Sequence, residues 1–208
     1  MVAKKPASSS SFLLEDVSWE AYEKVLAAFQ DRRLPHTYCA GILEFMTLTQ
    51  EHEWIKKLLA RFIENISIEL HVRLTSSGST TLKRELQQRG VEPDESYYVA
   101  HYAAVRGLKR INLEKHPPPD LVAEVDATNK SLDRLETYAK IGVPEIWHHD
   151  HQGLRFLKRA SSASYRVVKQ SVAFPQISSE AIQKFLHLRS TRDEYDLLND
   201  FIAWLRTL

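Results

Sequence analysis

The sequence lacks the features that mark disulfide-rich, secreted and membrane-spanning proteins. Cys39 is the only cysteine among 208 residues, which excludes an internal disulfide framework and fits a reducing cytoplasm. No uninterrupted apolar run approaches the roughly 18 residues that a membrane-spanning helix requires. Residues 1–11 are polar and serine-rich, without the apolar centre of a secretory signal. We therefore expect a cytoplasmic protein whose residues 1–11 form a disordered tail.

Common motifs for nucleotide cofactors and serine hydrolases are also missing. The six glycines form neither a P-loop nor a GxGxxG fingerprint. Gly78 and Ser79 lie in an expected turn without the flanking pattern of a GxSxG elbow. The net charge of +1 gives no global attraction to nucleic acid, so any such binding must come from a local patch.

What remains is the composition of an ordinary globular domain. Apolar residues make up 43% and charged residues 26% of the chain. A chain of this length buries about 70% of its unfolded surface, so it needs no disulfide or structural metal to fold. No internal repeat is evident. We expect a single domain over residues 12–208.

The strongest pattern lies in residues 116–150. Three consecutive prolines leave the chain extended, and residues 120–126 then alternate acidic and apolar side chains, with the period of a strand that has one apolar face. Helical spacing over 132–141 follows, and then a second strand over 145–149. The sequence thus predicts a βαβ-like unit with carboxylates where the first strand meets its helix.

The spacing of apolar residues predicts the remaining elements. They are helices over 18–30, 50–67, 178–187 and 193–205, hairpins over 36–47 and 154–170, and strands over 68–75, 80–83 and 96–100. The longest helix carries two acids in its first turn, of which Glu51 shares the apolar stripe and Glu53 points outward. The alternative is that both are surface acids that complement the helix dipole.

Histidines and basic residues give weaker signals. His148, His149 and His151 invite a metal site, but adjacent strand residues point to opposite faces, so we expect a polar strand end instead. Residues 105–115 carry four basic side chains around a glycine. They predict either a solvated loop or a loop that contacts phosphates.

Two carboxylates carry the main chemical hypothesis. Asp94 begins one strand and Glu124 ends another, and oxygen ligands from adjacent strand ends suit Mg²⁺ or Mn²⁺. Such an ion can polarise a scissile phosphate and lower the pKa of an attacking water. A nearby cation, Lys130 or Arg134, would position that water or offset developing charge. The alternative is that the acids are surface charges on an edge of the sheet.

Five segments in one order resemble the PD-(D/E)xK nuclease superfamily, and the Uma-type restriction endonuclease family in particular, over roughly residues 36–200. The segments are LEFMTLTQEHE (43–53), SGSTTLKRE (77–85), GVEPDESYYV (90–99), PPPDLVAEVDATNKSLDRLETYAKIGVPEIWHHD (117–150) and SVAFP (171–175). The resemblance implies a restriction-endonuclease-like α/β (α+β) fold with core order αβββαβ and a central mixed sheet flanked by helices.

The resemblance also implies roles for individual residues. Asp94 matches the acid of the PD motif and Glu124 the acid of the (D/E)xK motif, both as metal ligands. The standard lysine position holds Asp126, and the place of the lysine on the following helix in this family falls on Arg134. Arginine keeps the charge but cannot be deprotonated, so Lys130 is the alternative.

An auxiliary acid on the first core helix would fall near Glu51. The implied function is a Mg²⁺- or Mn²⁺-dependent endonuclease that hydrolyses DNA phosphodiester bonds, with a homodimer expected by analogy. One alternative is a degenerate nuclease fold that binds nucleic acid or a partner protein. Another is a hydrolase of small phosphate esters, which would have a closed pocket in place of an open basic groove.

Overall fold

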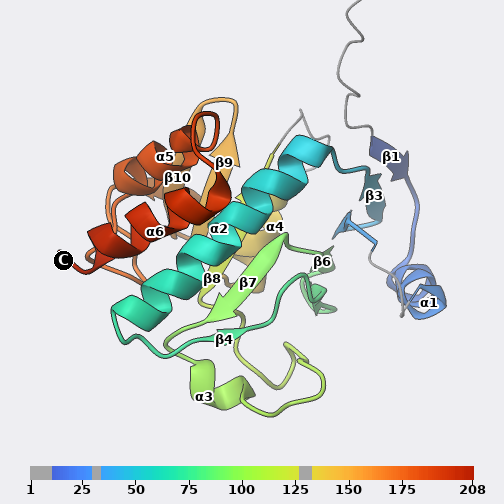
Figure 1. Cartoon of the computed structure of the whole chain (residues 1–208). Helices are drawn as coiled ribbons and strands as arrows, with labels where there is room; N and C mark the ends of the chain where they lie inside the picture. The colour runs from blue at the N-terminus through green and yellow to red at the C-terminus, as the bar shows by residue number, and fades with distance from the viewer. Residues whose placement is uncertain (1–10, 30–33, 127–132) are drawn as a thin grey trace, which may run out of the picture.

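The computed structural model describes residues 11–29, 34–126 and 133–208, which form six helices and two sheets. Lys130 and residues 1–10 of the expected tail lie outside the described residues. Ser11, which we assigned to the tail, begins the first strand. Figure 1 shows the two sheets side by side, with the longest helix crossing the larger one.

The larger sheet is six-stranded and mixed. Its spatial order is β11 (Tyr165–Val168), β10 (Gly153–Arg159), β9 (Glu145–Asp150), β8 (Leu121–Val125), β7 (Glu95–Tyr98) and β4 (Thr75–Ser76). Only β8 and β9 are parallel among its neighbouring strands, because α4 (Arg134–Ile141) returns the chain between them. Helix α4 starts at the N-cap Asp133 and ends at Gly142, whose φ of 103° favours glycine. The predicted βαβ unit is confirmed.

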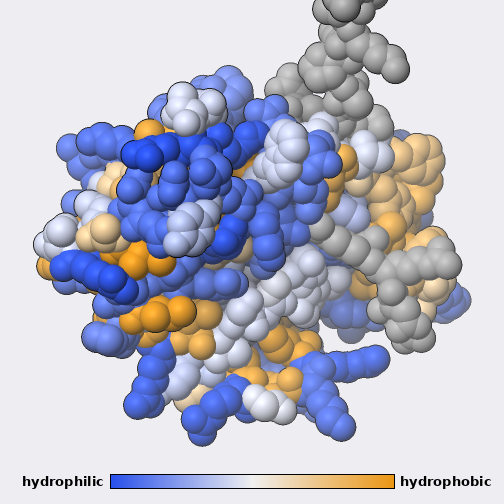
Figure 2. Space-filling view, viewed as in Figure 1, coloured by the Kyte–Doolittle hydropathy of each residue, from blue (hydrophilic) through white to orange (hydrophobic). Residues whose placement is uncertain are grey.

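Helices cover both faces of this sheet. On one face lie α2 (Gln50–Glu69), α5 (Ser179–Leu188) and α6 (Glu194–Leu205), and on the other lies α4. The outer surface of α2, α5 and α6 is mostly hydrophilic, as expected for helices with one apolar side (Figure 2). In chain order α2, β4, β7, β8, α4 and β9 give the predicted αβββαβ core, so the fold class is confirmed.

Strand β8 is buried on both faces, which corrects the expectation of a single apolar face. Leu121, Ala123 and Val125 join the core beneath α2, whereas Val122 joins the core beneath α4. Both neighbours of β8 in the sheet are present as well. Its remaining side chain, that of Glu124, is therefore enclosed by protein.

The smaller sheet is antiparallel and contacts α4. Its order is β1 (Ser11–Leu14), β3 (Ile42–Met46), β2 (His36–Cys39), β6 (Arg89–Val91) and β5 (Leu82–Arg84). The predicted hairpin over 36–47 is confirmed, and it turns at Ala40 and Gly41, which both have positive φ. Helix α1 (Trp19–Ala28) packs Tyr22 onto β6 so closely that a Cβ at Gly90 would lie 2.1 Å from the Tyr22 hydroxyl.

One predicted strand is wrong. Residues 68–75 do not form a strand: α2 continues to Glu69, and only Thr75 and Ser76 pair with β7. A further short helix, α3 (Tyr102–Val105), was not predicted. None of the helices in the described ranges is long and apolar enough to cross a membrane.

Candidate active site

The two predicted carboxylates lie opposite each other at one end of the larger sheet. In the antiparallel pair β7 and β8, Glu95 is opposite Ala123, so the next position places Asp94 opposite Glu124. Asp94 is 5% exposed and Glu124 is 2% exposed. The interpretation of these acids as surface charges is therefore wrong, because β8 is a central strand covered on both faces.

Asp94 is held by a histidine and a backbone amide. Its Oδ2 accepts hydrogen bonds from His52 Nε2 and from the Val125 N–H, each at 2.9 Å. Burial alone raises the pKa of the Asp94 carboxyl. The hydrogen bond and charge of His52, with the charge of Arg134, outweigh burial and hold this pKa below its ordinary value. The carboxyl is therefore ionised at neutral pH.

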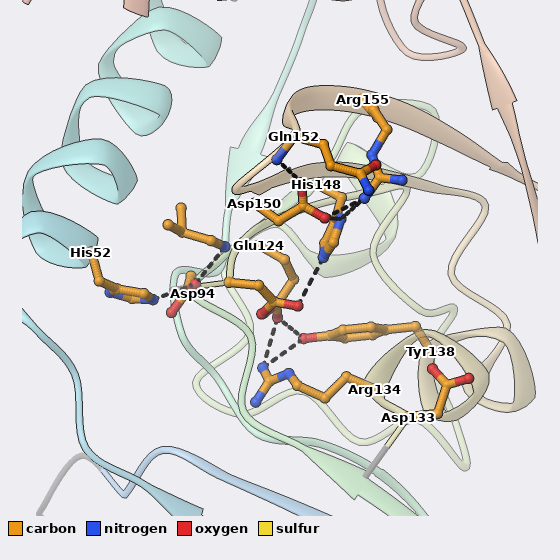
Figure 3. Close-up of polar contacts among 12 residues, drawn as sticks. His52, Asp94, Glu124, Asp133, Arg134, Tyr138, His148, Asp150, Gln152 and Arg155 are labelled. Atoms are coloured by element: carbon orange, nitrogen blue, oxygen red, sulfur yellow. Dashed lines mark hydrogen bonds and ion pairs between the residues drawn. The ribbon is translucent and has the colours of Figure 1, made fainter. Parts of the chain in front are cut away.

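Glu124 is held by an arginine and a tyrosine (Figure 3). Arg134 Nη2 donates to Glu124 Oε1 at 2.7 Å, and the Tyr138 hydroxyl donates to the same oxygen in a short hydrogen bond. The two donors are four residues apart on α4 and so lie on one side of the helix. Burial and the charge of Glu124 raise the pKa of Tyr138 well above its usual value, so its hydroxyl stays protonated.

Arg134 also connects the two sheets. Its Nη2 donates to the Glu92 carbonyl oxygen at 2.7 Å, and its Nη1 donates to Thr37 Oγ1 at 3.3 Å. The side chain is 6% exposed. Burial lowers the pKa of this guanidinium, but Glu124 outweighs burial, so the pKa lies well above its usual value. Arg134 is thus a fixed internal cation and cannot accept a proton from water.

A second series of hydrogen-bonded polar side chains lies beside these carboxylates, centred on His148 of β9. His148 Nε2 contacts Asp126 Oδ2 at 2.8 Å, and its Nδ1 accepts from Arg155 Nη2 at 3.2 Å. Arg155 also forms an ion pair with Asp150. Since arginine only donates, the proton of His148 sits on Nε2 and is donated to Asp126. His148 therefore belongs to a polar strand end, as the sequence predicted.

The structure places some of the predicted site residues together and others elsewhere. It brings Asp94, Glu124 and Arg134 together, whereas Lys130 lies outside the described residues. The expectation that Glu51 shares the buried side of its helix is wrong, because Glu51 is exposed and His52 is buried. The true stripe passes through His52, Lys56 and the apolar residues beyond them.

His52 is the residue that sequence reasoning missed. Its signal was present in the spacing, since His52 lies four residues before Lys56 and seven before the buried Leu59. The four basic side chains of residues 105–115 are all exposed. They follow the C-terminal end of β7, whereas Asp94 precedes its N-terminal end. A phosphate contact by this loop would therefore lie away from the two carboxylates, and both interpretations of the loop stay predictions.

Comparison with known proteins identifies related sequences and folds. The family model described as "Uma2: Putative restriction endonuclease" matches residues 19–187. Among solved structures, a match is the crystal structure of "a putative nuclease belonging to DUF820 from Anabaena variabilis ATCC 29413". Its TM-score is 0.51 at 12% sequence identity, over 72% of this chain and 89% of that chain. Comparison with curated proteins gave no match. At this identity the structural match shows a shared fold.

Proposed function

Because the chain belongs to the Uma2 family of restriction-endonuclease-like proteins, we propose that it is a divalent-metal-dependent endonuclease that hydrolyses DNA phosphodiester bonds. The observation that carries this proposal is the pair Asp94 and Glu124, buried opposite each other at the end of a central sheet. Two buried acids at one place are costly unless cations compensate them. In this proposal a bound metal ion adds to the compensation that His52, Arg134 and Tyr138 already supply.

The donor set suits a hard cation. In the part of the chain that the structure describes, no group of three or more His, Cys, Asp or Glu side chains could hold a metal ion by itself. Asp94 and Glu124 would therefore hold Mg²⁺ or Mn²⁺ together with water and phosphate oxygens, as is common for Mg²⁺. When bound, such an ion polarises the phosphate and lowers the pKa of its bound water.

The remaining residues take supporting roles in this proposal. Arg134 orients Glu124 and offsets its charge from within the protein. His52 orients Asp94 and keeps it ionised. Lys130 stays the candidate for a cation at the phosphate, and Glu51 the candidate for an auxiliary acid near the start of α2. The lone Cys39 supports a cytoplasmic location, and analogy to the fold supports a homodimer.

One observation favours the alternative of a degenerate nuclease fold that only binds nucleic acid or a partner. The guanidinium of Arg134 is enclosed and bonded to Glu124, the Glu92 carbonyl and Thr37. A cation held in this way stabilises the acid pair without any metal. The two functions therefore differ in one respect, which is whether the protein cuts DNA when metal is added.

The test is cleavage of supercoiled plasmid by the purified protein with Mg²⁺, with Mn²⁺ and with a chelator. We expect metal-dependent nicking, which Asp94→Asn lowers at least about 100-fold, a loss typical of removing a key electrostatic group. The matched control is Asp200→Asn, an acid of α6 whose side chain is 45% exposed and pairs with Arg192.

Three results would decide between the functions. Cleavage lost in Asp94→Asn and kept in Asp200→Asn supports the nuclease. Salt-sensitive DNA binding without cleavage, by protein that is folded, supports the binding module. A folded protein that neither cuts nor binds DNA contradicts both the nuclease and the nucleic-acid-binding module, and leaves only the binding of a partner protein.

A further inference from the structure

A polar pocket lies at the same end of the larger sheet as the acid pair. It has a volume of about 450 Å³, within the usual range for small-molecule sites. Three segments line it: the start of α2, the turn between β9 and β10, and the C-terminal end of α5. We call it the polar pocket. None of its groups has a role in the proposed hydrolysis except the candidate auxiliary acid Glu51.

The polar pocket adjoins the acid pair through two elements. On α2, Glu51 lines the pocket and its neighbour His52 bonds to Asp94. On β9, His149 lines the pocket, and its carbonyl accepts from the Asp126 N–H at 2.7 Å. A chain crossing the end of the sheet past Asp94 would therefore reach the pocket on the side covered by α2 and α5.

The charges of the polar pocket do not suit an isolated phosphate. Its one arginine, Arg189, is matched by the acids Glu51 and Asp150, and Asp150 is already paired with Arg155. Burial lowers the pKa of His149, which favours its neutral imidazole at neutral pH. A bare phosphate would find no excess of positive charge here.

The groups present do suit a flat, uncharged ring with donors and acceptors on its edge. His149 and His151 supply imidazoles and Gln152 supplies an amide, each with both donor and acceptor capacity. Gln183 and His187 also line the pocket, where they bond to each other, and Gln183 accepts from the Leu154 N–H. Ile55 and Leu186 supply apolar surface.

An aromatic platform stands beside the pocket. Trp54 is 50% exposed, and the guanidinium of Arg189 lies over its ring at 4.9 Å. Exposed aromatic rings and arginine planes are the surfaces on which bases of single-stranded nucleic acid stack.

We propose that the polar pocket is a subsite for one unpaired nucleobase of the nucleic-acid substrate. This inference rests on the proposed function, because it assumes that the chain crossing the sheet end is nucleic acid. The base enters between α2, the β9–β10 turn and α5, and its edge hydrogen-bonds to the imidazoles and amides. The adjoining sugar–phosphate chain then passes Asp94.

The test compares a fluorescein-labelled single-stranded DNA 12-mer with the same 12-mer made entirely of abasic sites, by fluorescence anisotropy in a chelator. We expect the double variant His151→Ala/His187→Ala, two exposed positions, to bind the normal 12-mer roughly 10-fold more weakly, as for loss of contacts to one base. Its affinity for the abasic 12-mer should not change. His116→Ala, in the loop before β8 at the other end of the sheet, is the matched control.

A second variant protects the test against misfolding. Ser190→Trp, at the exposed end of α5, adds bulk at the pocket and should give the same selective loss. Equal losses for both 12-mers, or no loss with either variant, would overturn the base subsite even if plasmid cleavage by the unsubstituted protein stands. If the unsubstituted protein binds neither 12-mer and does not cut plasmid, the nuclease proposal itself fails.

Discussion

The two carboxylates of the candidate site are equally buried but are compensated in different ways. Asp94 depends on a histidine and a backbone amide, and Glu124 depends on a guanidinium and a phenol. The arginine keeps its charge at every accessible pH and bonds directly to Glu124. At Asp94 it acts through its charge alone, beside the hydrogen bonds from His52 and Val125 that protonation of the acid would remove. The Glu124 half thus contains a cation that never loses its proton, and the Asp94 half is the one whose carboxyl pKa is shifted below its ordinary value.

The largest effect should come from removing the permanent cation. Arg134→Met leaves Glu124 charged and buried without its ion-pair partner, which typically costs about 3–5 kcal/mol of the free energy of unfolding. Urea unfolding at pH 7 measures this loss. Arg134→Lys keeps the charge but not the two-pronged contacts to Glu92 and Thr37, so it should fall between Met and the unsubstituted protein.

A double variant checks the cause of that loss. Arg134→Met/Glu124→Gln removes the unpaired charge, so it should recover part of the stability that Arg134→Met loses. A loss below about 1 kcal/mol in Arg134→Met would show that Glu124 is not stabilised mainly by this pair.

A smaller and pH-dependent effect is expected on the Asp94 side. His52→Ala removes a hydrogen bond to a buried carboxylate, which should cost about 1–3 kcal/mol at pH 7. Because the folded-state pKa of Asp94 lies below its unfolded value near 3.9, its stabilising contribution is present above that pH and is lost as pH falls through the folded pKa. The deficit of His52→Ala should therefore shrink below about pH 4.

A double-mutant cycle assigns this deficit to the pair. His52→Ala and Asp94→Asn should be coupled by about 1 kcal/mol or more at pH 7, and the coupling should decline toward pH 3. Unfolding in urea across this pH range gives both numbers. A coupling that is absent at pH 7 would show that His52 stabilises α2 without acting through Asp94.

The same asymmetry explains what the sequence could predict. Asp94, Glu124 and the βαβ unit follow from local patterns, namely side chains that alternate along a strand and apolar residues at helical spacing. The enclosure of Arg134 does not follow from such patterns. Its partner Thr37 lies 97 residues away in β2 of the smaller sheet, and its partner Glu92 lies 42 residues away, directly after β6.

Two wrong predictions, the buried side of α2 and the strand over 68–75, also come from long-range packing that local patterns do not show. The spacing of apolar residues puts Glu51 on the buried side of α2, and a tryptophan three residues later, Trp54, would ordinarily face inward with it. Trp54 is instead 50% exposed beneath Arg189, a residue of the far C-terminal part of the chain. The strand predicted over 68–75 is wrong because residues 68–74 alternate apolar and polar side chains as a strand does, although the first two belong to the last turn of α2.

The smallest expected change in the free energy of unfolding comes from removing a buried tyrosine hydroxyl. Its size should depend on whether that hydroxyl donates to a carboxylate. Tyr138→Phe removes the donor to Glu124 Oε1 and should cost about 1 kcal/mol in urea unfolding. The matched control is Tyr97→Phe, because the buried Tyr97 hydroxyl has no hydrogen-bond partner among the described residues. Its removal should leave stability unchanged or raise it slightly. If both variants lose the same amount, the phenol contributes to packing alone, and Glu124 is held by the arginine without help from Tyr138.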